Sequence, residues 1–135
     1  TDLDEALSRL DDPVMRRRTQ HVVTENARVL AAADLLRAGD LRGIAPLLDE
    51  SHVSMRDQFE ITVPTVDLAV ETAMTAGALG ARMTGGGFGG CIIALVAAGG
   101  ADTVAESIGE AFASSGYRAP AHFIGRPSDG ARRLR

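Results

Sequence analysis

The sequence has few of the residues that mark several large classes of protein. Its 135 residues include one cysteine, Cys91, and no tryptophan, and aromatic residues make up only 4%. A single cysteine excludes an internal disulfide bond and fits a reducing, cytoplasmic compartment. The three histidines and Cys91 are scattered without the spacing of metal ligands. We therefore predict that this chain forms no metal site of its own.

Long hydrophobic runs are also missing. The longest extends from Cys91 to Ala98, which is far below the roughly 18 residues that a membrane-spanning helix needs. No basic start is followed by an apolar stretch, so a secretory signal is not expected. The net charge of −4 argues against nucleic acid, because binding to it depends on neutralising phosphates. We expect neither a membrane nor a nucleic acid as a partner.

The length and the hydrophobic content of 45% fit one globular domain. The first half has apolar residues at intervals of three and four, which predicts amphipathic helices. Gly39 is placed to end the longest helix, Asp40 to cap the next one, and Pro64 to begin another. The predicted helices cover residues 3–10, 14–38, 41–55, 64–76 and 101–115.

The second half favours strands, at Ala81–Thr84, Cys91–Val96 and Ala121–Gly125. A break at Phe59–Val63 predicts a short extended piece, and the residues from Arg126 onward resemble a tail. The predicted fold is therefore α+β, with a small antiparallel sheet of at least three strands covered by helices.

A glycine-rich stretch separates the first two predicted strands. Five of its seven residues are glycine, which loses more conformational freedom on folding than any other residue. A strand-like run follows the last glycine, so the dinucleotide fingerprint, which needs a helix there, does not fit. No Gly-Lys-Ser/Thr closes a phosphate-binding P-loop either. Two readings remain, a structural turn with close backbone packing or a loop whose backbone N–H groups lie beside an anionic ligand. The stretch consists of Thr84, Gly85, Gly86, Gly87, Phe88, Gly89 and Gly90.

Single side chains add weaker signals. Phe88 is predicted to anchor the loop by burying its ring, and Cys91 to act as a small buried hydrophobe. His21 is predicted to be a packed or hydrogen-bonded helix residue, and His122 a structural residue in a strand. A further group, expected to lie together as capping and ion-pair residues where a helix ends, consists of His52, Arg56 and Asp57.

Four blocks of the sequence carry a resemblance to a known family. The stretch Met83–Cys91, MTGGGFGGC, resembles the third signature motif of the GHMP small-molecule kinases in the form typical of galactokinases. Residues 21–27, residues 50–67 and residues 125–131 resemble further galactokinase stretches, in the same order. The likeness covers almost the whole chain. By this resemblance, residues 1–135 are similar to a GHMP kinase C-terminal domain. The resemblance implies a ferredoxin-like antiparallel sheet covered by helices.

The resemblance implies a function. Members of the family transfer the γ-phosphoryl group of ATP, bound with Mg²⁺, to the C1 hydroxyl of galactose. It also implies that Thr84–Gly90 lies at the interface between two lobes and supports the nucleotide site. His52, Arg56 and Asp57 become candidates for a contact with the other lobe, as the alternative to an ion-pair cluster.

The sequence lacks the family's sugar-binding signature and its second, phosphate-holding loop. We therefore expect the N-terminal lobe of the same protein to supply the catalytic residues and most contacts to ATP and Mg²⁺. The chain alone is then expected to be inactive. Two alternatives stay open: a galactokinase-like regulatory protein that responds to sugar and ATP through protein contacts, and a truncated product without activity of its own.

Overall fold

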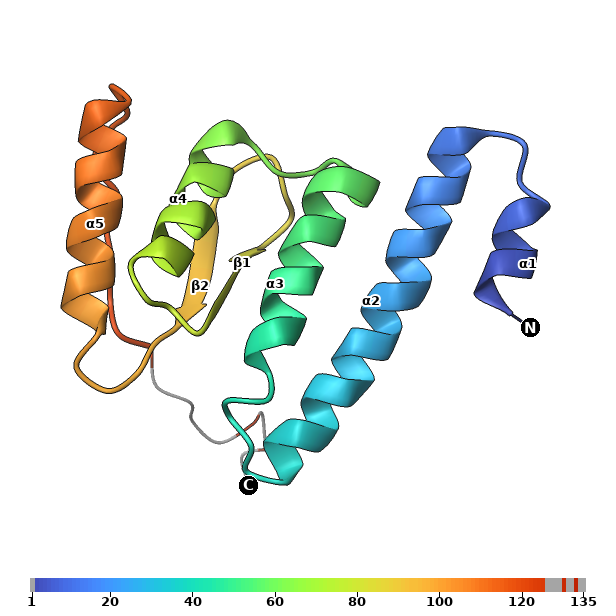
Figure 1. The fold of residues 1–135 in the computed structure, drawn as a ribbon, viewed down its shortest axis with the longest axis horizontal. Coiled ribbons are helices and arrows are strands. Elements are labelled where there is room, and N and C mark those ends of the chain that lie inside the picture. Colours follow the sequence, from blue (N-terminus) through green and yellow to red (C-terminus); the bar gives the residue numbers. More distant parts are fainter. Residues whose placement is uncertain (1, 126–129, 131–132, 134–135) are drawn as a thin grey trace.

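A computed structural model describes residues 2–125, 130 and 133 as five α-helices, a short π-helix and two strands. Figure 1 shows α5, α4, the two-stranded sheet, α3, α2 and α1 following one another across the molecule. Along the chain the elements are α1 (Leu3–Ser8), α2 (Pro13–Arg37), α3 (Ala45–Ser54), the π-helix η1 (Met55–Phe59), α4 (Pro64–Thr75), β1 (Gly80–Thr84), β2 (Cys91–Leu95) and α5 (Ala101–Ser114).

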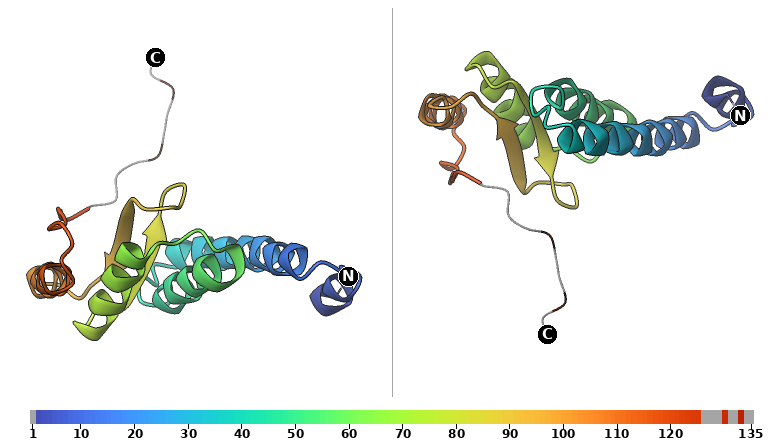
Figure 2. Two further views of the ribbon diagram at one scale, coloured as in Figure 1. Left: turned by 90° about the horizontal axis from the view of Figure 1, so that it is seen from above. Right: turned by 90° about the horizontal axis from the view of Figure 1, so that it is seen from below.

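The strands β1 and β2 form an antiparallel pair in which Met83 lies opposite Ile92 and Ala81 opposite Ala94. Because side chains alternate along a strand, these four residues share one face of the sheet. That face packs on α4 and α5. The loop between the strands projects beyond the row of helices, as the two views in Figure 2 show.

The core has two adjoining parts on that face. The larger part joins Val70 and Ala73 of α4 to Ala81 of β1 and Val104 of α5. The smaller part joins Met55, Val66 and Met83, the last of which is completely buried. Ile92 contacts both parts. The end of β1 that leads into the glycine loop is therefore fixed in the core.

Several predicted helix ends are confirmed. The helix α2 begins at Pro13, one residue before the expected start, and Asp12, which the sequence analysis did not single out, caps it by accepting a hydrogen bond of 2.8 Å from the N–H of Val14. After α2, Gly39 has a φ of 76°, which glycine adopts without strain, and its N–H bonds the carbonyl of Leu36. Pro64 begins α4 as expected. These signals are local, which is why the sequence was sufficient to find them.

Other expectations are wrong. Asp40 accepts a bond of 2.8 Å from the N–H of Gly43, but α3 begins at Ala45, so Asp40 caps a preceding turn. The expected extended piece at 59–63 is shorter, because the π-helix runs through Phe59. Among the described residues the sheet has two strands and not three, since residues 121–125 pair with neither β1 nor β2.

His122 is accordingly exposed and lies outside any strand. The expected tail from Arg126 onward lies outside the described residues, apart from Gly130 and Arg133. Within the part of the chain that the structure describes, no helix is both long enough and apolar enough to cross a membrane.

Candidate functional site

The glycine loop connects β1 to β2, and its backbone explains its composition. Four glycines of the loop have positive φ angles between 90° and 127°, namely Gly85, Gly87, Gly89 and Gly90. Residues with a Cβ rarely adopt such φ angles. A Cβ added at Gly85, Gly86 or Gly89 would meet no atom within 4 Å. These glycines therefore leave an open backbone surface that another chain or a ligand can approach closely.

Gly87 differs, because it lies against the segment before α4. A Cβ at this position would lie 2.9 Å from Cβ of Ile61 and 3.1 Å from its carbonyl oxygen. The next residue, Phe88, donates its N–H to that same oxygen at 2.7 Å. The middle of the loop is thus held on Ile61 by one hydrogen bond and one close packing contact.

Two predictions about side chains near the loop are wrong. Phe88 is 75% exposed, because the contact with Ile61 is made by its backbone and needs no buried ring. Cys91 is also exposed, since Ile92 faces the core and neighbouring side chains point to opposite faces of a strand.

The segment that holds the loop follows an irregular turn. The π-helix η1 ends at Phe59, and Glu60 adopts a left-handed backbone with φ 56° and ψ 46°. The N–H of Ile61 then returns to the carbonyl of Met55 at 3.1 Å. This turn aims the Ile61 carbonyl at Phe88. π-helical turns often occur at functional sites, and the sequence shows no glycine here that would have predicted the left-handed residue.

The outer edge of β1 is covered by α3. Gly80 of β1 lies so close to the first residue of α3 that an added Cβ would be 2.4 Å from the carbonyl oxygen of Ala45. Two side chains of α3 accept the free N–H groups of the strand: Asp49 bonds Ala81 at 2.8 Å, and Nδ1 of His52 bonds Met83 at 3.3 Å. The strand edge is therefore satisfied without a third strand on that side.

His52 makes its polar contacts with Met83 and Asp67 and bonds neither Arg56 nor Asp57, its expected partners. Its ring is buried and its Nε2 lies 3.2 Å from Oδ1 of Asp67 on α4. The geometry is that of an electrostatic contact and not of a well-aligned hydrogen bond. Burial lowers the pKa of His52, and the nearby Asp67 carboxylate only partly opposes this effect. The imidazole is therefore neutral at neutral pH.

Arg56 and Asp57 form an ion pair on the surface, as the sequence predicted. Nε of Arg56 lies 2.7 Å from Oδ1 of Asp57, and Glu71 of α4 approaches the same guanidinium at 3.7 Å. The hydrogen bond from Arg56 lowers the pKa of Asp57. Their role at an interface with another lobe remains a prediction.

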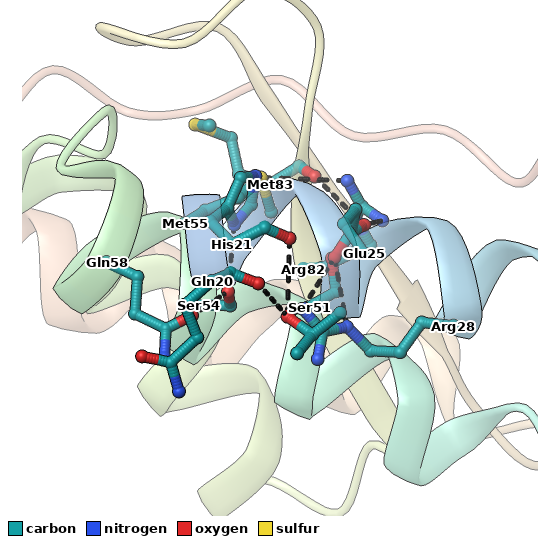
Figure 3. A network of polar contacts seen from close by, with 11 residues as sticks. Gln20, His21, Glu25, Arg28, Ser51, Ser54, Met55, Gln58, Arg82 and Met83 are labelled. Carbon is teal, nitrogen blue, oxygen red and sulfur yellow. Dashed lines mark hydrogen bonds and ion pairs between the residues drawn. The ribbon is translucent and has the colours of Figure 1, made fainter. Parts of the chain in front are cut away.

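A polar network that the sequence analysis missed joins α2, α3 and β1 (Figure 3). Glu25 accepts hydrogen bonds from Ser51 at 2.6 Å and from Arg82 at 3.0 Å, and Arg28 bonds its other oxygen. Burial alone would raise the pKa of Glu25, but these donors and the two arginine charges hold it below its ordinary value. Arg82 also donates to the Met83 carbonyl at 3.0 Å, beside the start of the loop.

His21 belongs to a neighbouring part of the same interface (Figure 3). Its Nδ1 lies 2.8 Å from the hydroxyl of Ser54, and its ring stacks on Phe59 with centroids 4.5 Å apart. Burial lowers its pKa. The prediction of a packed, hydrogen-bonded histidine is confirmed, and its stacking fixes the end of η1 next to α2.

Comparison with known proteins identifies the family. The family described as GHMP kinases C terminal matches residues 32–114. The chain belongs to this GHMP kinase family. It is 54% identical to a galactokinase of Streptomyces coelicolor over 98% of its own length, and 51% identical to a galactokinase of Mycobacterium bovis over 86%. It spans 35% and 32% of the lengths of these two relatives.

A solved structure supports the same assignment. The crystal structure of Lactococcus lactis galactokinase complexed with galactose is 38% identical, with a TM-score of 0.78 over 87% of this chain and 31% of that one. The α+β fold of a GHMP kinase C-terminal domain, with a small antiparallel sheet and covering helices, is thereby confirmed.

Proposed function

We propose that this chain is the C-terminal part of a galactokinase, an enzyme that transfers the γ-phosphoryl group of ATP to the C1 hydroxyl of galactose. The observation that carries the proposal is the 54% identity to the Streptomyces coelicolor galactokinase across 98% of this chain. The matched region, 98% of this chain, spans the glycine loop and the residues that contact it. A cytoplasmic location follows from the same proposal.

The glycine loop is proposed to support the nucleotide site. Phosphoryl transfer depends mainly on positioning and on stabilising the charge of the transferring group. Gly85, Gly86 and Gly89 have open space where a Cβ would lie, so their backbone can approach phosphate oxygens or the phosphate-binding loop of another lobe. The bond between Phe88 and Ile61 keeps this surface in place before ligand arrives.

The chemistry is proposed to reside in the N-terminal part of the same protein. Arg56 forms its ion pair with Asp57 at the surface, and His52 is buried against the outer edge of β1, so neither is assigned a catalytic role. No three His, Cys, Asp or Glu side chains gather into a metal-sized cluster within residues 2–125, 130 and 133. Mg²⁺ and most contacts to ATP are assigned to the N-terminal lobe, because this sequence lacks the family's second, phosphate-holding loop.

Galactose-dependent release of ADP from ATP and Mg²⁺ tests this function in the full-length protein. We expect turnover with galactose that exceeds turnover with glucose or N-acetylgalactosamine. A clear preference for another phosphate acceptor would replace galactose in the proposal and keep the kinase assignment. Absence of ATP turnover with every sugar would contradict the kinase assignment itself and favour a regulatory protein.

A further inference from the structure

A chain of polar groups leads from the segment before α4 to Met83, the residue that precedes the glycine loop. The Met83 N–H donates to Nδ1 of His52 at 3.3 Å. Nε2 of His52 faces Oδ1 of Asp67 at 3.2 Å, and Oδ2 of Asp67 accepts a bond from the hydroxyl of Thr62 at 3.2 Å. Met83 and His52 are both buried, so water does not replace the bond between them.

The partners fix the tautomer of His52. Because Nδ1 accepts the Met83 N–H, the ring proton must sit on Nε2, where it faces the Asp67 carboxylate. A carboxylate at this distance favours that tautomer electrostatically. A proton on Nδ1 would instead bring two donors together and break the bond to Met83.

This set of contacts holds the loop at two places. Met83 immediately precedes Thr84, where the loop begins. Thr62 follows Ile61, whose carbonyl binds the N–H of Phe88 in the middle of the loop at 2.7 Å. The start and the middle of the loop are therefore attached to neighbouring, connected groups, and a shift of His52 would displace one attachment relative to the other.

We propose that His52, oriented by Asp67, is a positioning residue for the glycine loop. It holds the Met83 amide so that the loop backbone is presented in one arrangement to the nucleotide side of the site. This role rests on the proposed function of the loop. It replaces the expectation that His52 contacts another lobe directly.

Burial, more than the surrounding charges, favours the neutral form of His52. Asp67 lies on α4, Arg56 and Asp57 lie on the turn after α3, and Arg82 lies on β1. Burial lowers the pKa of His52, the Asp67 carboxylate raises it, and Arg56 and Arg82 lower it, with a net lowering. The neutral ring that the Met83 contact requires is thus the dominant form at neutral pH.

Asp49 provides a matched control. It accepts the N–H of Ala81 at 2.8 Å, so it makes the same kind of contact on the same strand edge, two residues farther from the loop. If His52 only covers the edge of β1, removal of either acceptor will have the same consequences. If His52 positions the loop, only substitution of His52 will change the hydrogen exchange of residues 84–90.

Two substitutions separate the two ring nitrogens. In His52→Asn the amide oxygen takes the place of Nδ1 and still accepts from Met83. In His52→Gln the longer side chain reaches the place of Nε2 and offers no acceptor to Met83. The two His52 variants, the Asp49→Ala variant and the wild type are each prepared as full-length protein. For each protein we measure hydrogen exchange of the peptide that covers residues 83–90. The Michaelis constant for ATP, kcat and Tm are measured on the same samples.

We expect His52→Gln to speed exchange of this peptide and to raise the Michaelis constant for ATP about ten-fold, the effect of one lost buried hydrogen bond. In His52→Asn we expect the exchange rate and the Michaelis constant for ATP to stay within about three-fold of the wild type. Asp49→Ala lowers Tm and leaves both values unchanged.

The proposal is overturned if His52→Asn is as damaging as His52→Gln, or if Asp49→Ala changes loop exchange and the ATP constant equally. The exchange measurement needs no turnover. A wild type without galactose-dependent activity would therefore contradict the proposed function, while exchange still decides the role of His52.

Discussion

The backbone N–H of Phe88 donates a hydrogen bond of 2.7 Å to the carbonyl oxygen of Ile61. It joins the glycine loop to the segment after the π-helix, where Glu60 adopts a left-handed backbone. Gly87 packs on the same Ile61. A loop of five glycines would otherwise have great conformational freedom, and these contacts at Ile61 limit it.

Gly87→Val tests the close contact with Ile61. The new side chain would require Ile61 to move, because Cβ alone would lie 2.9 Å from Cβ of Ile61. It also places a branched residue at a φ of 90°. We expect the Michaelis constant for ATP in the full-length protein to rise at least about ten-fold, the equivalent of 1.4 kcal/mol.

Gly99→Val is the matched control for this change. Gly99 has a φ of 85° but no atom within 4 Å of an added Cβ, and it lies in the turn before α5. Both variants carry a backbone strain of roughly 1–2 kcal/mol. Only Gly87→Val should change the Michaelis constant for ATP. Equal effects of the two variants would show that the loop is only a structural turn.

Gly80→Ala tests the packing of α3 on the edge of β1. A Cβ at Gly80 would lie 2.4 Å from the backbone oxygen of Ala45, and a backbone atom cannot move aside as a flexible side chain does. We expect the free energy of unfolding in urea to fall by about 1–3 kcal/mol.

Gly109→Ala is the corresponding control inside a helix. Gly109 lies in α5 with open space around its missing Cβ, and alanine is the better helix former by about 0.8–1.0 kcal/mol. This variant should be more stable than the wild type. A Gly80→Ala protein of unchanged stability would show that α3 does not pack on β1 at that distance.

Acid should destabilise the fold through two buried histidines. Burial lowers the pKa values of His21 and His52 below the ordinary value of 6.5. Below pH 6.5 the unfolded state therefore binds more protons than the folded state, and the free energy of unfolding falls as the pH is lowered. The contribution is fully present above pH 6.5 and is lost as the pH falls towards the folded-state pKa values.

Urea unfolding of the wild type and of His52→Asn between pH 7.5 and pH 5 measures this effect. Each histidine can contribute a slope of up to about 1.4 kcal/mol per pH unit. The variant should show a shallower slope because one titrating ring is gone. An identical slope in both proteins would mean that His52 titrates alike in the folded and unfolded states.

The sequence was most informative where structure is decided locally. Gly39 and Pro64 mark helix ends because a left-handed φ and a missing N–H act within a few residues. The left-handed Glu60 was not predictable, because only the π-helix and the contact with the loop impose that conformation. The pairing of Glu25 with Arg82 spans 57 positions, and nothing local indicates it.

Residues 121–125 illustrate the limits of strand propensity. Their apolar composition favours a strand, yet strand formation also needs a partner edge. The outer edge of β1 is already satisfied by Asp49 and His52 of α3, and residues 121–125 do not pair with the edge of β2 either. Phe123 and Ile124 are exposed in this structure.

Glu25→Gln tests the network that joins α2, α3 and β1. Two half-buried arginines, Arg28 and Arg82, would lose the carboxylate between them. We expect the free energy of unfolding to fall by about 1–3 kcal/mol. Glu5→Gln serves as the control, because its ion pair with Arg9 lies on the surface and is expected to contribute less than about 1 kcal/mol. Equal losses would show that the network adds nothing beyond a surface pair.

The most direct test mixes this chain with the separately produced N-terminal part of the protein and follows galactose-dependent release of ADP from ATP and Mg²⁺. We predict no turnover by either part alone and turnover on mixing, which Gly87→Val in this chain reduces. Turnover by this chain alone would contradict the account, because residues 1–135 would then contain the catalytic groups that we assign to the N-terminal lobe.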